Sequence, residues 1–147
     1  MNSRKLIIAL SIVLLILGGV AIFAFVIEER VAPLPVPDLT GEWVQAGAEG
    51  SADWYFVADI TDDVIEIWWY LPSEDERALY WSGTFTPPPE GQTGTYTWTS
   101  VNDIAKAKTC MRASREETKH FTYKDGKISY VVTAGHLQMG YSLERVK

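Results

Sequence analysis

Side chains that commonly act as nucleophiles or metal ligands are scarce in this sequence. It contains one cysteine, Cys110, and two histidines, His120 and His136. Their spacing matches no short zinc motif, and the acidic run at residues 74–76 lacks the ligand spacing of a calcium-binding loop. No nucleophile elbow, phosphate-binding loop or dinucleotide-binding glycine pattern is present. The sequence therefore predicts no catalytic residue, no metal site and no cofactor, and we expect that the protein is not an enzyme.

The charge of the chain argues against a nucleic-acid partner. The formal net charge is −6, whereas binding to phosphate backbones needs a basic surface. Residues 38–103 hold thirteen acidic residues and one basic residue, and residues 104–147 hold nine basic and four acidic ones. Two interpretations remain open. The two stretches neutralise each other in the fold, or they form a two-signed surface that orients the domain against a partner or a lipid headgroup layer.

A long apolar run near the N-terminus predicts contact with a lipid bilayer. The 22 residues from Leu6 to Ile27 carry no charge. As a helix they would span about 33 Å, enough for a bilayer core of about 30 Å. Arg4 and Lys5 precede the run, and positively charged flanks stay in the cytoplasm. We therefore expect a cytoplasmic N-terminus at residues 1–5, one transmembrane helix at 6–27 in the cytoplasmic membrane, and an extracytoplasmic C-terminal domain.

The alternatives to a permanent anchor fit this run less well. The apolar part of a cleaved signal peptide is usually about 7–15 residues and ends in small residues. This run is longer, and no cysteine near it offers a lipidation site. Residues 28–40 follow, with proline at positions 33, 35 and 37, and predict a short extended spacer. The remaining residues, 41–147, form the predicted domain.

Hydrophobicity in this domain repeats every second residue, which is typical of β-strands. Asp125-Gly126, between two alternating segments, strongly predicts a tight hairpin. The short connections favour an antiparallel meander of about seven or eight strands, closed into a barrel or left as a strongly curled sheet. Residues 100–119 break the pattern and predict either a short helix, capped by Asn102 or Asp103, or a loop. The predicted strands are 41–46, 54–61, 64–71, 78–86, 94–100, 120–124, 127–133 and 140–146.

Strict alternation assigns the aromatic side chains of the third and fourth predicted strands to two faces. One face is predicted to lie in the core. The other is unusually aromatic for a solvated surface, and it is either a set of cross-strand pairs that stiffen the sheet or a binding patch. The predicted core face contains Ile65, Ile67, Trp69, Leu79, Trp81 and Phe85. The candidate patch contains Glu66, Trp68, Tyr70 and Tyr80.

The start of the first predicted strand resembles a calycin motif. Gly41-Glu42-Trp43 is similar to the G-x-W opening of lipocalin-type barrels. In that superfamily the tryptophan packs under a basic residue of the last strand, and Arg145 stands where such a residue would be. The resemblance implies a small lipocalin-like barrel, a structural pair of Trp43 and Arg145 that is stabilised by cation–π attraction, and at most one small ligand cavity.

Longer stretches resemble a group of small exported proteins. Segments 41–45, 79–85, 98–103 and 121–130 are similar to membrane-anchored or lipid-anchored proteins encoded by actinobacteria and by their phages and prophages. That group has no established biochemical activity. The resemblance therefore implies a fold and a location, and it implies no reaction or ligand.

Three functions of different classes fit these expectations. The first is a non-enzymatic binding module with a protein partner at the membrane or envelope, in phage-borne form a superinfection exclusion or immunity factor. The second is a structural subunit of an envelope membrane complex, docked through its helix, in which Gly18-Gly19 would allow close helix approach. The third is a carrier of a small apolar ligand, which ranks last because we do not expect a small-molecule ligand.

Overall fold

The computed structural model describes residues 34–48 and 53–146. The predicted transmembrane helix at 6–27 and the first part of the predicted spacer, 28–33, lie outside these residues. Within the described ranges no helix is both long enough and apolar enough to cross a membrane.

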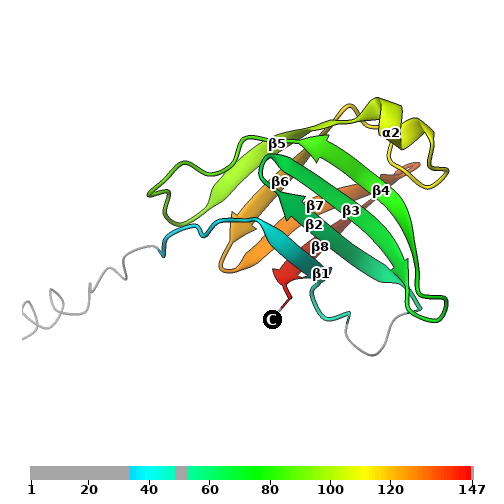
Figure 1. The fold of residues 1–147 in the computed structure, drawn as a ribbon, viewed down its shortest axis with the longest axis horizontal. Coiled ribbons are helices and arrows are strands. Elements are labelled where there is room, and N and C mark those ends of the chain that lie inside the picture. The colour runs from blue at the N-terminus through cyan, green and yellow to red at the C-terminus, as the bar shows by residue number, and fades with distance from the viewer. Residues whose placement is uncertain (1–33, 49–52, 147) are drawn as a thin grey trace, which may run out of the picture. The chain divides into compact units, whose positions relative to one another are not determined.

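Eight antiparallel strands close into one barrel in simple meander order (Figure 1). Each strand pairs with the next, and β1 closes the barrel by pairing with β8, with Trp43 opposite Arg145. The all-β prediction is confirmed, closure into a barrel is shown, and each predicted strand corresponds to an observed one. The strands are β1 (Gly41–Gln45), β2 (Tyr55–Thr61), β3 (Val64–Leu71), β4 (Glu76–Thr84), β5 (Tyr96–Asn102), β6 (Thr118–Lys124), β7 (Lys127–Ala134) and β8 (Leu137–Arg145).

Tight turns set the pairing of neighbouring strands. Asp125 and Gly126 have φ values of 50° and 81°, so both occupy the left-handed region that a two-residue hairpin turn requires. Lys124 and Lys127 pair directly across this turn. The predicted hairpin is confirmed.

A β-bulge changes the side-chain pattern of β4. Ile67 pairs with Trp81, and the next residue of β3, Trp68, pairs with Leu79, so Tyr80 is the extra residue. Tyr80 and Trp81 consequently both face the barrel interior, and Tyr80 is only 4% exposed. Leu79 instead lies on the outer side opposite Trp68. The predicted outward orientation of Tyr80 is therefore wrong, because a bulge inserts one residue into an otherwise alternating strand. Leu79 is buried as predicted, at 2% exposure, but it does not belong to the interior cluster.

The segment between β5 and β6 completes the wall of the barrel. β4 pairs with β5 only through Gly83 and Thr84. Further along β4, the amide N–H of Asp103 donates to the Ser82 carbonyl at 2.8 Å, and the amide N–H of Ser114 donates to the Tyr80 carbonyl at 2.7 Å. The short helix α2 (Ile104–Lys108) lies in this segment. Of the two predictions for this region, the short helix is correct.

The helix begins where its sequence provides a cap. The Asp103 carboxylate accepts a hydrogen bond from the amide N–H of Lys106 at 3.0 Å, which satisfies one of the unpaired donors at the helix start. Ala107 is the buried residue of the helix. Met111 lies beyond the helix end and is 98% exposed.

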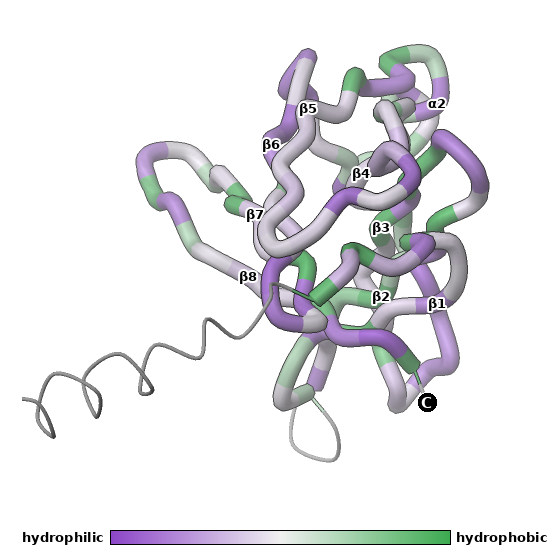
Figure 2. Tube along the Cα trace, turned by 90° about the vertical axis from the view of Figure 1, so that its left-hand side faces the viewer, coloured by the Kyte–Doolittle hydropathy of each residue, from purple (hydrophilic) through white to green (hydrophobic). Residues whose placement is uncertain are grey.

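Aromatic and aliphatic side chains fill the barrel interior. Figure 2 shows apolar and polar positions interleaved along the strands, as expected when one face of each strand points inward. Phe56 lies 4.4 Å from Trp69 and 5.2 Å from Tyr80 between ring centroids. Ile65 and Trp81 are 0% exposed, so no water-sized space adjoins either side chain.

Residues 34–40, the described part of the predicted spacer, pack onto the barrel. Pro35 forms an isolated bridge with Thr93, and the amide N–H of Val36 donates to the Gln92 carbonyl at 2.8 Å. Leu39 is buried within the core cluster. This part of the chain therefore belongs to the folded domain.

Candidate functional site

Half of the predicted patch supports α2. Glu66 accepts a hydrogen bond from the Ser82 hydroxyl at 2.8 Å and forms an ion pair with Lys106 of the helix. The Lys106 ammonium also lies 5.9 Å from the centroid of the Trp68 ring. Glu66 and Trp68 thus hold α2 against β3 and β4, which is a structural role.

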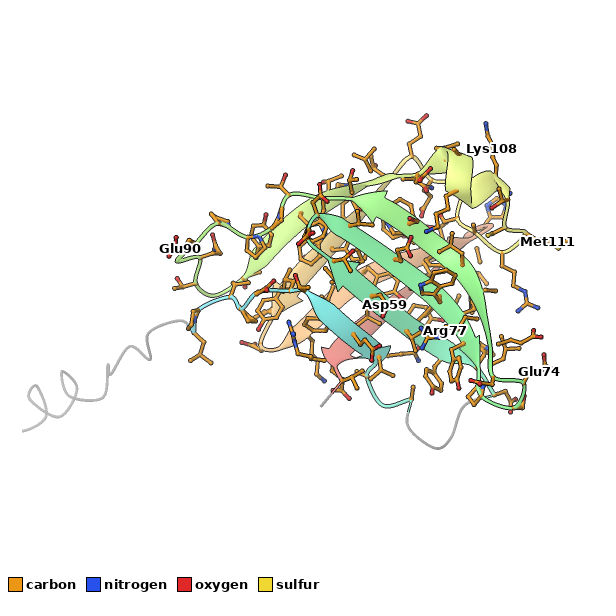
Figure 3. All side chains as sticks on the ribbon, in the orientation of Figure 1. Asp59, Glu74, Arg77, Glu90, Lys108 and Met111 are labelled. Atoms are coloured by element: carbon orange, nitrogen blue, oxygen red, sulfur yellow. The ribbon has the colours of Figure 1, made fainter. Side chains whose placement is uncertain are left out.

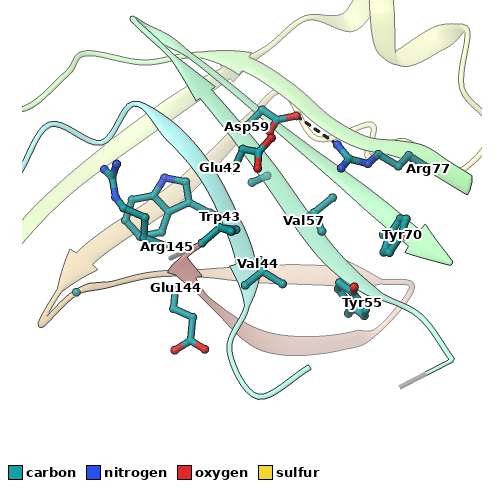
Figure 4. A pocket seen from close by; sticks show the side chains of 13 residues that line it. Glu42, Trp43, Val44, Tyr55, Val57, Asp59, Tyr70, Arg77, Glu144 and Arg145 are labelled. Carbon is teal, nitrogen blue, oxygen red and sulfur yellow. Dashed lines mark ion pairs between the residues drawn. The ribbon is translucent and has the colours of Figure 1, made fainter. Parts of the chain in front are cut away.

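Tyr70, the third predicted patch residue, lies apart from this contact on an open groove outside β1–β4 (Figure 4). Its ring packs edge-on against Tyr55 at 5.3 Å, and its hydroxyl donates to Asp75 at 2.9 Å. Asp59 and Arg77 form an ion pair across the groove at 3.6 Å. Both ionic side chains are largely hydrated, so this pair contributes little stability. Because Tyr80 faces inward, the structure does not bring the four predicted residues together.

The structure does bring Trp43 and Arg145 together. The Arg145 guanidinium carbon lies 4.9 Å from the centroid of the Trp43 ring. Nη1 of the same guanidinium donates a hydrogen bond to the Thr40 carbonyl at 2.8 Å. The Trp43 indole N–H donates to the Leu39 carbonyl at 2.9 Å. These contacts tie residues 39–40 across the first and last strands.

A second concave surface lies at one end of the barrel. Figure 3 shows Met111 and Glu74 at this end, and Glu90 at the other end. Glu90 belongs to the loop that contacts residues 34–36. We call the surface near Met111 the mouth. The mouth therefore opens away from the place where the described chain enters the barrel.

Two open pockets that share Trp69 and Arg112 form the mouth, with volumes of about 520 Å³ and 360 Å³. Two exposed apolar side chains, Trp54 and Met139, line them from separate parts of the chain. Met111, 98% exposed, precedes the lining residue Arg112 in the chain, and Leu137, 67% exposed, pairs with the lining residue Ala134. The residues that line the two pockets are Trp54, Trp69, Leu71, Tyr80, Arg112, Ala113, Ser114, Arg115, Glu116, Val132, Thr133, Ala134 and Met139.

A buried lysine lies beneath the mouth. Lys119 points into the barrel and forms an ion pair with the Glu116 carboxylate. Its ammonium group also donates to the Val131 carbonyl at 3.0 Å and lies 5.3 Å from the ring centroid of Tyr80. The charge is therefore paired and hydrogen-bonded, as a buried ammonium group must be.

Six buried side-chain polar atoms of the described residues have no hydrogen-bond partner. They are the indole N–H groups of Trp68, Trp69 and Trp98, the hydroxyls of Tyr80 and Tyr130, and Oδ1 of Asn102. An unsatisfied buried polar group costs about 1–3 kcal/mol of stability. Burial raises the pKa of Tyr80 and of Tyr130 well above the ordinary value, with smaller contributions from neighbouring Glu116 and tyrosines, and the nearby Ser114 side chain opposes part of this rise at Tyr80. Both phenols therefore remain protonated and available as donors at neutral pH.

This arrangement is suited to binding. Within the part of the chain that the structure describes, no cluster of histidine, cysteine, aspartate and glutamate could hold a metal ion. His120, one of the few reactive side chains, bonds Thr99 on the outer face at 2.9 Å, away from the mouth.

Sequence reasoning missed the residues of the mouth. Trp54, Arg112 and Met139 lie in or beside connections that are distant in sequence. In an antiparallel meander, alternate connections lie at the same end of the sheet. That rule could have grouped the loop before β2 with the β7–β8 hairpin, although it could not have oriented their side chains.

Comparisons with known proteins assign no family. No protein-family model, curated protein or solved structure gives a significant match to the chain. The likenesses to calycin barrels and to exported proteins of actinobacteria and their phages therefore stay predictions, and the function has to be argued from the mouth.

Proposed function

We propose that this protein is a non-enzymatic binding module, anchored in the cytoplasmic membrane by residues 6–27, that presents the mouth of its barrel to a protein partner in the cell envelope. The observation that carries this proposal is the convergence of exposed apolar side chains from separate loops on one concave end of the barrel. Clustered exposed apolar residues on a soluble domain usually mark an interaction site.

The chemistry of the partner follows from the mouth. Met111, Leu137 and Trp54 offer apolar contact area, and Arg112 adds a charged group to the same surface. Tryptophan, methionine and arginine are enriched where proteins bind one another. A partner that fits would insert apolar side chains into the mouth and place a carboxylate against Arg112.

The resemblance to proteins of phages and prophages supports one specific form of this function. An anchored module facing the envelope could block the entry of a later phage, as an exclusion or immunity factor. The alternative, a structural subunit of an envelope complex, would use the helix with Gly18-Gly19 for docking.

A carrier of calycin type with a central cavity receives less support. Such a carrier needs an apolar cavity among Ile65, Trp69, Trp81 and Phe85. Ile65 and Trp81 are fully buried, and Phe85 packs 5.3 Å from Trp98. The interior at these positions is filled by side chains, as small barrels commonly are.

A double charge substitution tests the role of the mouth. The variant Met111→Asp with Leu137→Asp changes two exposed side chains, so folding should be retained. Val101→Asp, on the exposed outer face of β5, is the matched control. After crosslinking, we expect the double variant of the full chain to recover at least about tenfold less envelope protein than the wild-type chain. A tenfold loss of affinity corresponds to about 1.4 kcal/mol of binding free energy.

The same variants test the exclusion form of the function. Cells expressing the wild-type chain or the Val101→Asp control should show reduced plaque formation by at least one phage, and cells expressing the double variant should not. Equal partner recovery by all three chains would show that the mouth is not the binding surface. Unchanged plaque formation with the wild-type chain, for every phage tested, would contradict the exclusion form alone.

A further inference from the structure

We infer that the open edge of β8 pairs with the same edge of a second copy of this chain, so that two barrels form a dimer through an antiparallel strand pair. The inference goes beyond the proposed function, because it concerns backbone groups of β8 and not the side chains that line the mouth. Three features of the described residues support it.

The first feature is a stretch of β8 that has a neighbouring strand on one side only. β8 pairs with β7 from Leu137 to Glu144, but it pairs with β1 only from Leu143 to Arg145. Among the described residues, no other element forms a backbone hydrogen bond with residues 137–141. Figure 2 shows the β7–β8 hairpin projecting from the barrel, so this edge is accessible. Closing a barrel abolishes strand edges, and the projecting hairpin leaves one open.

The second feature is the direction of the backbone groups along this edge. In an antiparallel strand, the backbone groups of successive residues point alternately to the two sides. The Ser142 carbonyl points toward β1, where it accepts from the amide N–H of Ala46 at 2.8 Å. Gly140 and Gln138 precede Ser142 by two and four residues, so their N–H and C=O groups point to the same side. Unpaired groups in this pattern are a template for another extended strand.

The third feature is that the segment is complementary to itself. When two copies pair about Met139, Gln138 of each copy lies opposite Gly140 of the other. The outward N–H groups of each copy then donate to the outward carbonyls of the other. Gly140 has no side chain, and a Cβ atom there would meet nothing within 4 Å, so the opposing Gln138 side chain has space.

The side chains on the other face of this segment also match. Leu137 of one copy lies opposite Tyr141 of the other, and Met139 lies opposite its own counterpart. Leu137 is 67% exposed and Met139 40% exposed, so pairing covers apolar area in both copies. Residues 137–141 carry no charge, although charged residues or proline commonly protect strand edges. Two copies of a chain with a net charge of −6 therefore meet here without like-charge repulsion between opposing residues.

Disulfide crosslinking tests the pairing and its register. Cys110→Ser first removes the native thiol, and the purified full chain in detergent micelles is oxidised with copper phenanthroline. In Met139→Cys the two introduced thiols lie directly opposite each other, in a close pair that a disulfide can bridge. We expect a covalent dimer. Leu137→Cys is the matched control, because its thiols would lie about 14 Å apart along the strand pair, and it should crosslink at least about tenfold more slowly.

A proline substitution tests the backbone hydrogen bonds. Gly140→Pro removes the outward N–H, and proline is tolerated at a sheet edge where its nitrogen faces away from the neighbouring strand. In the Met139→Cys background it should slow crosslinking at least about tenfold. Gly140→Ala keeps the N–H and should crosslink like the parent chain. Thermal unfolding checks that each variant is folded.

The outcomes decide between a second copy and other occupants of the edge. No covalent dimer from Met139→Cys, or equal rates for Met139→Cys and Leu137→Cys, overturns the inference. An undiminished rate in folded Gly140→Pro also overturns it, and if that variant does not fold, the comparison of the two cysteine positions decides alone. In oxidised intact cells, a disulfide from Met139→Cys to a different protein in place of a second copy would assign the edge to that protein.

Discussion

At the scale of single residues, two buried hydroxyls of similar burial should respond in opposite ways to removal. The Tyr80 hydroxyl has no hydrogen-bond partner, so Tyr80→Phe should leave the free energy of unfolding unchanged or raise it by up to about 1 kcal/mol. The Ser100 hydroxyl accepts from the Trp81 indole N–H at 3.1 Å. Ser100→Ala should therefore lower the free energy of unfolding by about 1–3 kcal/mol, because it leaves that N–H unpaired.

Urea unfolding of both variants beside the wild-type chain measures these changes. If Tyr80→Phe lowers the free energy of unfolding by more than about 1 kcal/mol, the Tyr80 hydroxyl has a hydrogen-bond partner.

Protonation of Glu116 should account for part of the protein's loss of stability at acid pH. Burial raises the pKa of this carboxyl, but the hydrogen bond and charge of Lys119, together with hydrogen bonds from Ser114 and Thr133, outweigh burial and hold the pKa below its ordinary value of 4.5. A carboxyl with a lowered folded-state pKa stabilises the fold above its unfolded-state pKa. That contribution is lost as the pH falls through the folded-state value.

The free energy of unfolding of Glu116→Gln should therefore decrease less than that of the wild-type chain when the pH is lowered from about 5 to about 3. Thermal unfolding across this range measures the effect, and Glu117→Gln at the exposed neighbouring position is the control. An identical pH dependence in Glu116→Gln and the wild-type chain would mean that the pair with Lys119 does not stabilise the fold.

At the scale of elements, Gly83 marks where β4 and β5 approach most closely. A Cβ atom at this position would lie 2.5 Å from the Ser100 hydroxyl and 2.6 Å from the Val101 carbonyl oxygen. Gly83→Ala should lower the free energy of unfolding by about 1–3 kcal/mol, because the backbone oxygen cannot move without breaking the strand pair. At Gly140 in β8 a Cβ would meet nothing within 4 Å.

Gly140→Ala is therefore the matched control, with an expected change within about 0.5 kcal/mol. Chemical denaturation of the two variants in parallel makes the comparison. Similar unfolding midpoints for both would show that β4 and β5 are not in close contact at Gly83.

The sequence predicted the strands and hairpins well because both are local properties. Alternating hydrophobicity located all eight strands, and Asp125-Gly126 located the β6–β7 hairpin. The bulge at Tyr80 could not be predicted, because Tyr80 and Leu79 are both compatible with either face of a strand. Their sides are decided by packing against Phe56 and against the segment containing α2.

At the scale of the whole molecule, residues 34–40 act as part of the domain and not as a free spacer. Leu39 is buried in the core, whereas Leu34 is 77% exposed. Leu39→Ala should lower the free energy of unfolding by about 2–5 kcal/mol, and Leu34→Ala should change it by less than about 0.5 kcal/mol. Thermal and urea unfolding of the full chain measure both. Equal effects of the two substitutions would contradict the packing of Leu39.

The proline pattern predicted an extended spacer at residues 28–40, and it gave no sign that residues 34–40 dock on the barrel. The mouth was beyond prediction for a related reason. Its residues come from four parts of the chain, including Trp54, Arg112 and Met139, and they meet only when the barrel closes. The likeness of Gly41-Glu42-Trp43 to a calycin motif suggested the contact between Trp43 and Arg145, which lies far from the mouth.

The central claim, that the mouth is the binding surface, is tested most directly by photo-crosslinking in intact cells. A photoreactive amino acid at the exposed Leu137 lies opposite Ala134 of the mouth lining, and one at Thr97 lies on the exposed outer face of β5. The account predicts a discrete adduct with one envelope protein from Leu137 and none from Thr97. An adduct from Thr97 alone, or the same adduct from both positions, would contradict it.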